Sequence, residues 1–129
     1  MSRYVLDSSA LLSLTMAEPG ADRVTRLLES ASCVMSAVNY AEVVGKLQDV
    51  GMSAGEISSQ IAGLRLTVHP FDRDQGLHCG WLRAKTRALG LSLGDRACLQ
   101  LAAALSATAV TADRIWGKLK IGVKIEVLR

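Results

Sequence analysis

The stretch RYVLDSSALLSLT, residues 3–15, decides the fold expected for this chain. It places a short apolar run directly before Asp7 and a predicted helix directly after it. Strand-like runs of the same kind recur along the chain, at residues 3–7, 32–36, 65–69, 107–111 and 123–128. Helical stretches lie between these runs, and strands that alternate with helices indicate a parallel sheet covered on both faces.

The predicted helices are bounded by residues that commonly begin or end a helix. Helical segments are expected at residues 10–18, 21–30, 38–50, from Ser53 onward, 72–89 and 92–106. The sequence therefore predicts an α/β fold, a three-layer α/β/α sandwich around a central, mostly parallel sheet of four to five strands. A length of 129 residues fits one domain, 1–129, and its core is expected to be aliphatic because only five residues are aromatic.

Four acidic residues are predicted to meet at one edge of this sheet. Asp7 and Asp113 follow two of the strands directly, and Glu42 lies in the first turns of the helix after the second strand. Asp95 opens a helix that must run back toward the strand 107–111. Each acid alone is explained as a helix cap, a turn residue or an exposed helix residue, but four such residues have no reason to share one edge. Open α/β sheets bind ligands at this edge.

A group of carboxylates without histidine or thiolate selects a hard cation, Mg²⁺ or Mn²⁺, rather than zinc. The three cysteines and two histidines lack the spacing of a zinc site. A hard cation on phosphate polarises the phosphoryl oxygen and lowers the pKa of a bound water. We therefore interpret the four acids as the metal site of a metal-dependent nuclease. The hydroxyl groups of Ser8 and Thr111 are predicted to hydrogen-bond to a bound water or to a carboxylate.

Charge is distributed unevenly along the chain. Residues 1–64 carry four Lys/Arg against seven Asp/Glu, whereas residues 65–129 carry eleven against five. This excess of positive charge favours a polyanionic partner, although a solvated helix face explains it equally well. Arg96 and Arg114 adjoin Asp95 and Asp113 in sequence, although neighbours on a helix do not share a face. They are candidates for contact with RNA phosphate, and the alternative is that they simply lie at the rim of the site. No segment resembles a signal peptide or approaches the roughly 20 apolar residues of a membrane span, so a soluble cytoplasmic protein is expected.

Four motifs make the chain resemble a PIN-domain ribonuclease, specifically the toxin of a VapBC-type toxin–antitoxin pair. They occur in the expected order over almost the whole chain: VLDSSALL at 5–12, NYAEV at 39–43, SLGDRACLQLA at 92–102 and TADRIW at 111–116. One such motif is weak evidence, whereas four in order are strong evidence. The chain departs from the family pattern at Gly94, where we expect no functional cost.

The resemblance implies an α/β/α sandwich and a single-strand endoribonuclease that depends on Mg²⁺ or Mn²⁺. It implies that Asp7, Glu42, Asp95 and Asp113 are the catalytic, metal-binding carboxylates. It also implies a homodimer and inhibition by a cognate VapB-like antitoxin whose C-terminal segment lies along the active-site groove.

Three alternatives compete with a nuclease. A phosphorelay receiver requires two adjacent acids near its first strand, but Asp7 follows Val5 and Leu6. An Asp-x-Asp phosphatase requires an acid at position 9, which is Ser9. The remaining alternative is an RNA-binding module of the same fold without turnover. The intact set of four acids argues against it, because a domain without catalysis has no need for a repulsive cluster.

Overall fold

The computed structural model describes residues 2–129. The strands are Arg3–Leu6 (β1), Ser32–Ser36 (β2), Leu66–His69 (β3), Thr108–Thr111 (β4) and Ile125–Val127 (β5). The α-helices are Ser8–Thr15 (α1), Ala21–Ser30 (α2), Ala37–Asp49 (α3), Ala54–Ala62 (α4), Arg73–Thr86 (α5) and Leu93–Leu105 (α6). Two short 3-10 helices complete the chain, Arg87–Leu89 (η1) and Arg114–Lys118 (η2).

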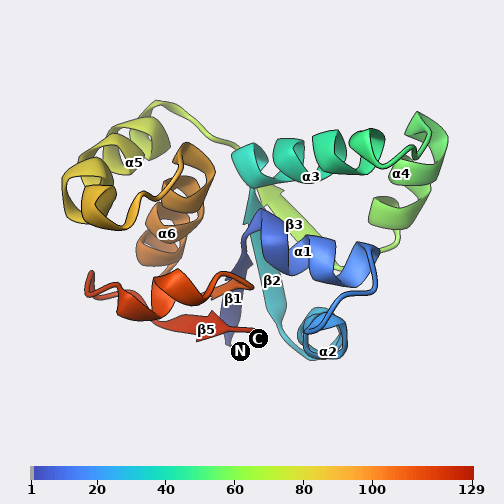
Figure 1. Cartoon of the computed structure of the whole chain (residues 1–129), viewed down its shortest axis with the longest axis horizontal. Helices are drawn as coiled ribbons and strands as arrows, with labels where there is room; N and C mark the ends of the chain where they lie inside the picture. The colour runs from blue at the N-terminus through green and yellow to red at the C-terminus, as the bar shows by residue number, and fades with distance from the viewer. Residues whose placement is uncertain (1) are drawn as a thin grey trace.

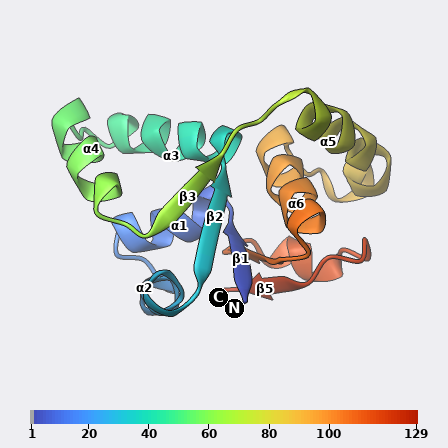
Figure 2. The same cartoon turned by 180° about the vertical axis from the view of Figure 1, so that it is seen from behind.

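All five strands form one parallel sheet in the order β3-β2-β1-β4-β5. Helices α1 to α4 lie on one side of this sheet and α5 and α6 on the other, as Figures 1 and 2 show from opposite sides. This arrangement is the predicted three-layer α/β/α sandwich. The prediction of a parallel central sheet is confirmed, with five strands.

Successive residues of the inner strands point into two different cores. In β1, Val5 packs with α5, α6 and η2, whereas Leu6 packs with α1 to α4. In β4, Ala109 packs in the same core as Val5, and Val110 packs in the same core as Leu6. Side chains alternate between the two faces of a strand, and a parallel sheet with helices on both faces has no solvated side. The apolar runs seen in the sequence therefore follow from burial on both faces.

The chain reverses its direction of travel across the sheet beside β1. After β1 it builds outward through β2 and β3, and it then returns to place β4 on the other side of β1. Such a reversal opens a crevice at the carboxyl ends of the two strands where it occurs. Asp7 follows β1 directly, and Ala112 and Asp113 follow β4. The fold thus brings these segments to the crevice.

Most predicted helix limits agree with the structure to within two residues. The first helix is shifted: it begins at Ser8 rather than residue 10, because the Asp7 side chain caps it, and it ends at Thr15 rather than residue 18. The helix η2 after Asp113 was not predicted. Gly20 ends the break before α2 with φ +103°, a conformation that favours glycine. Across residues 2–129, every helix is too short or too polar to cross a membrane.

Candidate functional site

Asp7 is the buried centre of the predicted acidic edge. Only 4% of the residue is exposed to solvent. As the N-cap of α1, its Oδ1 accepts hydrogen bonds from Ala10 N at 2.8 Å and from Ser9 Oγ at 2.7 Å. Its Oδ2 accepts a bond from Thr111 Oγ1 at 2.6 Å, which joins β1 to β4. The carboxylate is therefore fixed on both oxygens by the two strands and the helix that meet at the crevice.

The acidity of Asp7 is unusual because the side chain is buried. Burial raises the pKa of this carboxyl from 3.8 to about 6, even though the bonds from Thr111, Ser9 and Ala10 favour the charged form. The nearby negative charge of Asp95 makes a smaller contribution to this rise in the pKa. A carboxylate that is desolvated and faces a second acid gains stability from any cation placed beside it.

Glu42 reaches the same place from α3. Its Oε1 accepts hydrogen bonds from Ser8 Oγ, at the start of α1, and from Asn39 Nδ2 at 3.0 Å. Asn39 is buried and also donates to the carbonyl oxygen of Gly94 at 3.0 Å, one residue before Asp95. These contacts join the amino ends of α1, α3 and α6.

Asp95 and Asp113 each begin a helix at the crevice. Asp95 Oδ2 accepts a bond from Ser92 N at 2.9 Å and completes the capping box of α6. Asp113 Oδ1 accepts a bond from Ile115 N at 3.0 Å as the N-cap of η2. Asp113 N donates to Thr111 Oγ1 at 3.0 Å, so this residue adjoins the hydroxyl that holds Asp7. Both acids lie where a helix amino terminus favours negative charge.

Cys98 lies within the electrostatic influence of three of these acids. This thiol is fully buried in α6, and burial raises its pKa well above the usual 9.0. The charges of Asp7, Asp95 and Glu42 each raise it further. Three carboxylates from three segments of the chain therefore act on one buried atom.

The four acids have no cationic partner in the part of the chain that the structure describes. None of them forms a salt bridge with any of residues 2–129. Glu42 Oε2, Asp95 Oδ1 and Asp113 Oδ2 also accept no hydrogen bond from these residues. Across the same residues, no three acidic, histidine or cysteine side chains already stand as ligands around one point. The chemistry of these carboxylates fits a hard cation.

The hydroxyl groups predicted at Ser8 and Thr111 both bond to carboxylates, the first to Glu42 and the second to Asp7. The two arginines differ. Arg114 is exposed, and its Nε donates to the carbonyl oxygen of Arg129 at 3.2 Å. Arg96 is only 8% exposed, and its Nη1 donates to the carbonyl oxygen of Cys79 in α5 at 3.1 Å. A role for Arg96 in contacting RNA phosphate conflicts with this burial between α5 and α6.

Sequence reasoning missed two residues of this site. Ser9 Oγ donates to Asp7 Oδ1 and accepts from Ala112 N at 2.9 Å, so it joins α1 to the segment after β4. Asn39 joins Glu42 to α6. The spacing of Asn39 to Glu42, three residues on a helix, was a usable signal because such residues lie on one face. No local signal pointed to the bond between Ser9 and Ala112, which are 103 positions apart in sequence.

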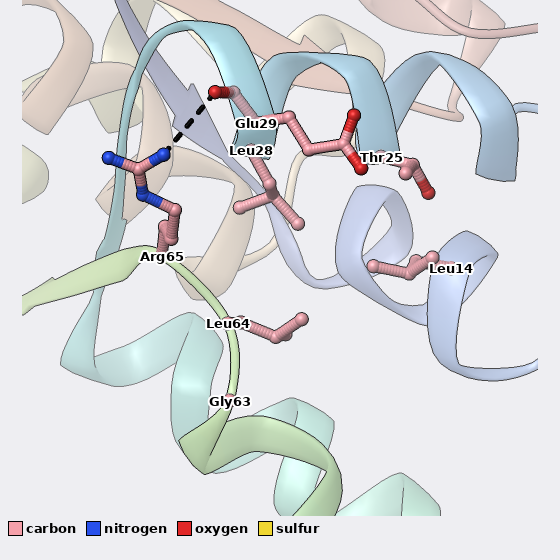
Figure 3. A pocket seen from close by; sticks show the side chains of 7 residues that line it. All are labelled: Leu14, Thr25, Leu28, Glu29, Gly63, Leu64 and Arg65. Atoms are coloured by element: carbon pink, nitrogen blue, oxygen red, sulfur yellow. Dashed lines mark hydrogen bonds between the residues drawn. The ribbon is translucent and has the colours of Figure 1, made fainter.

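A separate pocket of about 280 Å³ lies between α1, α2 and the segment before β3 (Figure 3). Its lining is largely apolar and includes Leu14, Leu28 and Leu64. Arg65 Nη1 donates to the carbonyl oxygen of Glu29 at its rim, at 3.5 Å. None of the predicted site residues lines this pocket, and Glu29 is its single carboxylate. The acidic edge is therefore the better candidate for chemistry.

Comparison with known proteins agrees with the geometry. The family model described as PIN domain matches residues 4–121. No curated protein sequence matches the chain.

Several solved structures share the fold at low sequence identity. VapBC from Salmonella typhimurium, solved with DNA bound, matches with a TM-score of 0.76 and 18% identity over 100% of both chains. VapBC2 from Rickettsia felis, bound to a DNA fragment from its promoter, matches with a TM-score of 0.75 and 18% identity over 98% of this chain and 99% of that chain. VapC20 from Mycobacterium tuberculosis, a toxin that cleaves the sarcin-ricin loop, matches with a TM-score of 0.73 and 12% identity over 94% and 98%. At these identities the likeness is one of fold.

Proposed function

The chain belongs to the PIN domain family, and from this premise we propose that it is a metal-dependent endoribonuclease, the toxin of a toxin–antitoxin pair. The observation that carries the proposal is the gathering of acids at the crevice beside β1. Shared hydrogen bonds link the acids: Ser8, beside Asp7, donates to Glu42, and Asn39 donates both to Glu42 and to the Gly94 carbonyl oxygen beside Asp95. Thr111 Oγ1 bonds to both Asp7 and Asp113. No cation of residues 2–129 pairs with these acids. Carboxylates gathered at one edge of a sheet repel one another, and a bound cation removes the repulsion.

Asp7, Glu42, Asp95 and Asp113 are the proposed ligands, and the ion is Mg²⁺ or Mn²⁺. Carboxylate oxygens prefer such hard cations. Three of these acids have one oxygen held by a protein donor and the other oxygen without a donor in residues 2–129. In metal sites, neighbouring residues typically hydrogen-bond to a metal-ligating side chain and so orient the atom that binds the ion. When bound, the ion supplies positive charge for the phosphodiester oxygens and acidifies a water.

The protein's own residues orient these carboxylates. Ser9 and Thr111 hold Asp7 at the junction of β1 and β4, and Ser8 and Asn39 hold Glu42. Arg114 remains a proposed contact for RNA phosphate because its side chain is exposed beside Asp113. The hydroxyl groups of Ser8 and Thr111 act on substrate only through the carboxylates that they orient.

RNA is the proposed substrate, in the cytoplasm, and a VapB-like antitoxin and a second copy of the chain are the proposed partners. The excess of Lys and Arg in residues 65–129 supports a polyanionic substrate. The likeness in fold to toxins solved as VapBC complexes supports an antitoxin partner. The second candidate is an RNA-binding module of this fold without turnover, which the same positive charge supports.

Cleavage of a mixed pool of single-stranded RNA tests the proposal. The purified chain is assayed with Mg²⁺, with Mn²⁺ and with EDTA, beside the Asp7→Asn variant. We expect cutting that requires the metal and is lost in the variant. RNA that is bound under every condition but never cut would favour the binding module instead.

A further inference from the structure

Glu42 is held differently from the other three acids of the site. Each of the others accepts a hydrogen bond from a backbone N–H at the start of its own helix; the donors are Ala10, Ser92 and Ile115. Within residues 2–129, Glu42 accepts bonds from side chains alone, those of Ser8 and Asn39. Its side chain is long and its position on α3 is exposed. Neighbouring side chains therefore determine where its carboxylate lies.

Asn39 connects Glu42 to the start of α6. It lies one helical turn before Glu42 on α3 and is 1% exposed. Its Nδ2 is 3.0 Å from Glu42 Oε1, 3.0 Å from the Gly94 carbonyl oxygen and 3.3 Å from Ser8 Oγ. The carboxylate and the carbonyl can only accept, so the NH₂ end of the amide must face them. This amide ties the Glu42 carboxylate to the residue before Asp95.

Gly94 provides the space that this carboxylate occupies. A Cβ built on Gly94 would lie 2.7 Å from Glu42 Cδ, and the two nearer atoms are the oxygens of the same carboxylate. Gly94 is an α6 residue without a positive φ, so its backbone does not require glycine. No other group is among the three atoms nearest to that Cβ. The group nearest to a side chain at position 94, which that side chain must displace, is therefore a proposed metal ligand.

We propose that Asn39 and Gly94 are positioning residues that hold Glu42 beside Asp95 with Oε2 free for the cation. The proposal rests on the proposed function, because it assumes that Glu42 is a ligand. Asn39 supplies the donor that fixes Oε1, and Gly94 supplies the gap into which the carboxylate fits. A ligand already in place loses less conformational freedom when the ion binds. Loss of either residue should therefore weaken the affinity for the ion through Glu42.

Binding of Mn²⁺ to the full chain, measured by electron paramagnetic resonance of the free ion, tests this without relying on cleavage. Gly94→Ala should weaken Mn²⁺ binding about tenfold, the effect typical of residues that orient a ligand. Its melting temperature without metal should stay the same or rise, because alanine favours a helix more than glycine. A merely structural role for Gly94 would predict the reverse, a lower melting temperature with unchanged affinity.

Gly55→Ala is a matched control. Gly55 occupies the second position of α4, after the N-cap Ser53, just as Gly94 follows Ser92 in α6. A Cβ at Gly55 meets nothing within 4 Å. Both variants place alanine at the same helix position inside a capping box. Only Gly94→Ala should change the affinity for Mn²⁺.

Glu42→Ala separates this inference from the proposed function. Gly94→Ala and Asn39→Ala should each add no further loss of Mn²⁺ affinity in a chain that already carries Glu42→Ala, because both act through Glu42. The inference is overturned if Glu42→Ala weakens binding while Gly94→Ala and Asn39→Ala bind as tightly as the wild type. It is also overturned if Gly94→Ala causes an equal loss with and without Glu42. If the wild type does not bind Mn²⁺, or if Glu42→Ala does not weaken binding, the proposed ligand set is wrong. This inference is then overturned with it.

Discussion

Helices α4 and α6 begin in the same way. In α4, Ser53 Oγ accepts from Glu56 N at 3.2 Å and Glu56 Oε1 accepts from Ser53 N at 3.0 Å. In α6, Ser92 and Asp95 exchange the same two bonds at 3.1 and 2.9 Å. Each helix has a glycine one residue before the acid. In their local structure, the two segments are equivalent helix starts.

Their surroundings differ completely. The start of α4 faces open space, and the Glu56 pKa is lowered by its bonds to Ser53. The start of α6 faces Glu42, and the Asp95 charge raises the pKa of Asp7. Figure 1 shows α6 beside the centre of the sheet and α4 at the far end of α3. A capping box is therefore a local signal, and topology decides whether its acid joins other acids.

The largest expected difference between the two helix starts is catalytic. Asp95→Asn should reduce metal-dependent RNA cleavage by about 100-fold or more, since loss of a ligand should exceed the 10- to 100-fold effect of residues that orient ligands. Glu56→Gln should leave the rate unchanged. Each change should cost about 1 kcal/mol or less in the free energy of unfolding, because each weakens one capping box. Cleavage rates and urea unfolding of both variants check this, and equal losses of activity would contradict it.

The second expected difference is between two capping aspartates, the buried Asp7 and the exposed Asp72, and it concerns how stability depends on pH. The pKa of its carboxyl is 3.8 when unperturbed, as in the unfolded chain, and about 6 in the folded chain. Between these values the native state binds more protons than the unfolded state. Stability of the metal-free protein should therefore fall as pH rises from about 4 to above 6. A shift of this size corresponds to about 3 kcal/mol. Asp7→Asn removes the charge and should be about 1 to 3 kcal/mol more stable than the wild type at pH 8.

Asp72→Asn is the control for that measurement. Asp72 caps α5 and accepts from Gln75 N at 2.9 Å, as Asp7 accepts from Ala10 N, but it is exposed. Asparagine caps a helix about as well as aspartate, so this change should alter the free energy of unfolding by less than about 0.5 kcal/mol. Urea unfolding in EDTA at pH 4 and pH 8 provides the comparison. A wild type that is as stable at pH 8 as Asp7→Asn would show that the buried charge is already compensated.

The smallest expected difference is between the two capping serines. Ser53→Ala and Ser92→Ala should each lower the free energy of unfolding by about 1 kcal/mol, because each removes one side-chain cap. The backbone N–H of Ser92 still donates to Asp95 Oδ2 in the alanine variant, so cleavage should stay close to the wild-type rate. Thermal unfolding and cleavage assays measure both effects. A large loss of activity in Ser92→Ala alone would mean that the hydroxyl itself orients Asp95.

The sheet was predictable because burial on both faces of the inner strands β1, β2 and β4 produces continuous apolar runs. The limits of the five predicted runs lie within two residues of the limits of the strands. The positions of Asp7 and Asp113 follow from the same runs, since each residue comes just after one. The capping box at Ser53 and Glu56 was also predictable, because its signal is local.

Contacts between distant segments were not predictable in the same way. Asn39 bonds to the Gly94 carbonyl across 55 positions of sequence, and nothing near either residue indicates the other. Arg96 was a candidate for contact with RNA because it follows Asp95, although adjacent helix residues point in different directions. Arg96 lies against α5, where Cys79 accepts its hydrogen bond. Sequence therefore predicts which residues reach the crevice better than it predicts where their side chains point.

Paramagnetic broadening by Mn²⁺ tests most directly whether the acids beside β1 form the metal site. The chain, labelled with ¹⁵N, is titrated with small amounts of Mn²⁺, and the loss of each backbone amide signal is recorded. We predict early loss of the signals of Asp7, Glu42, Asp95 and Asp113, while those of Ser53 to Glu56 persist. Equal broadening at the starts of α4 and α6, or broadening confined to other acidic residues, would contradict a cation site at this crevice.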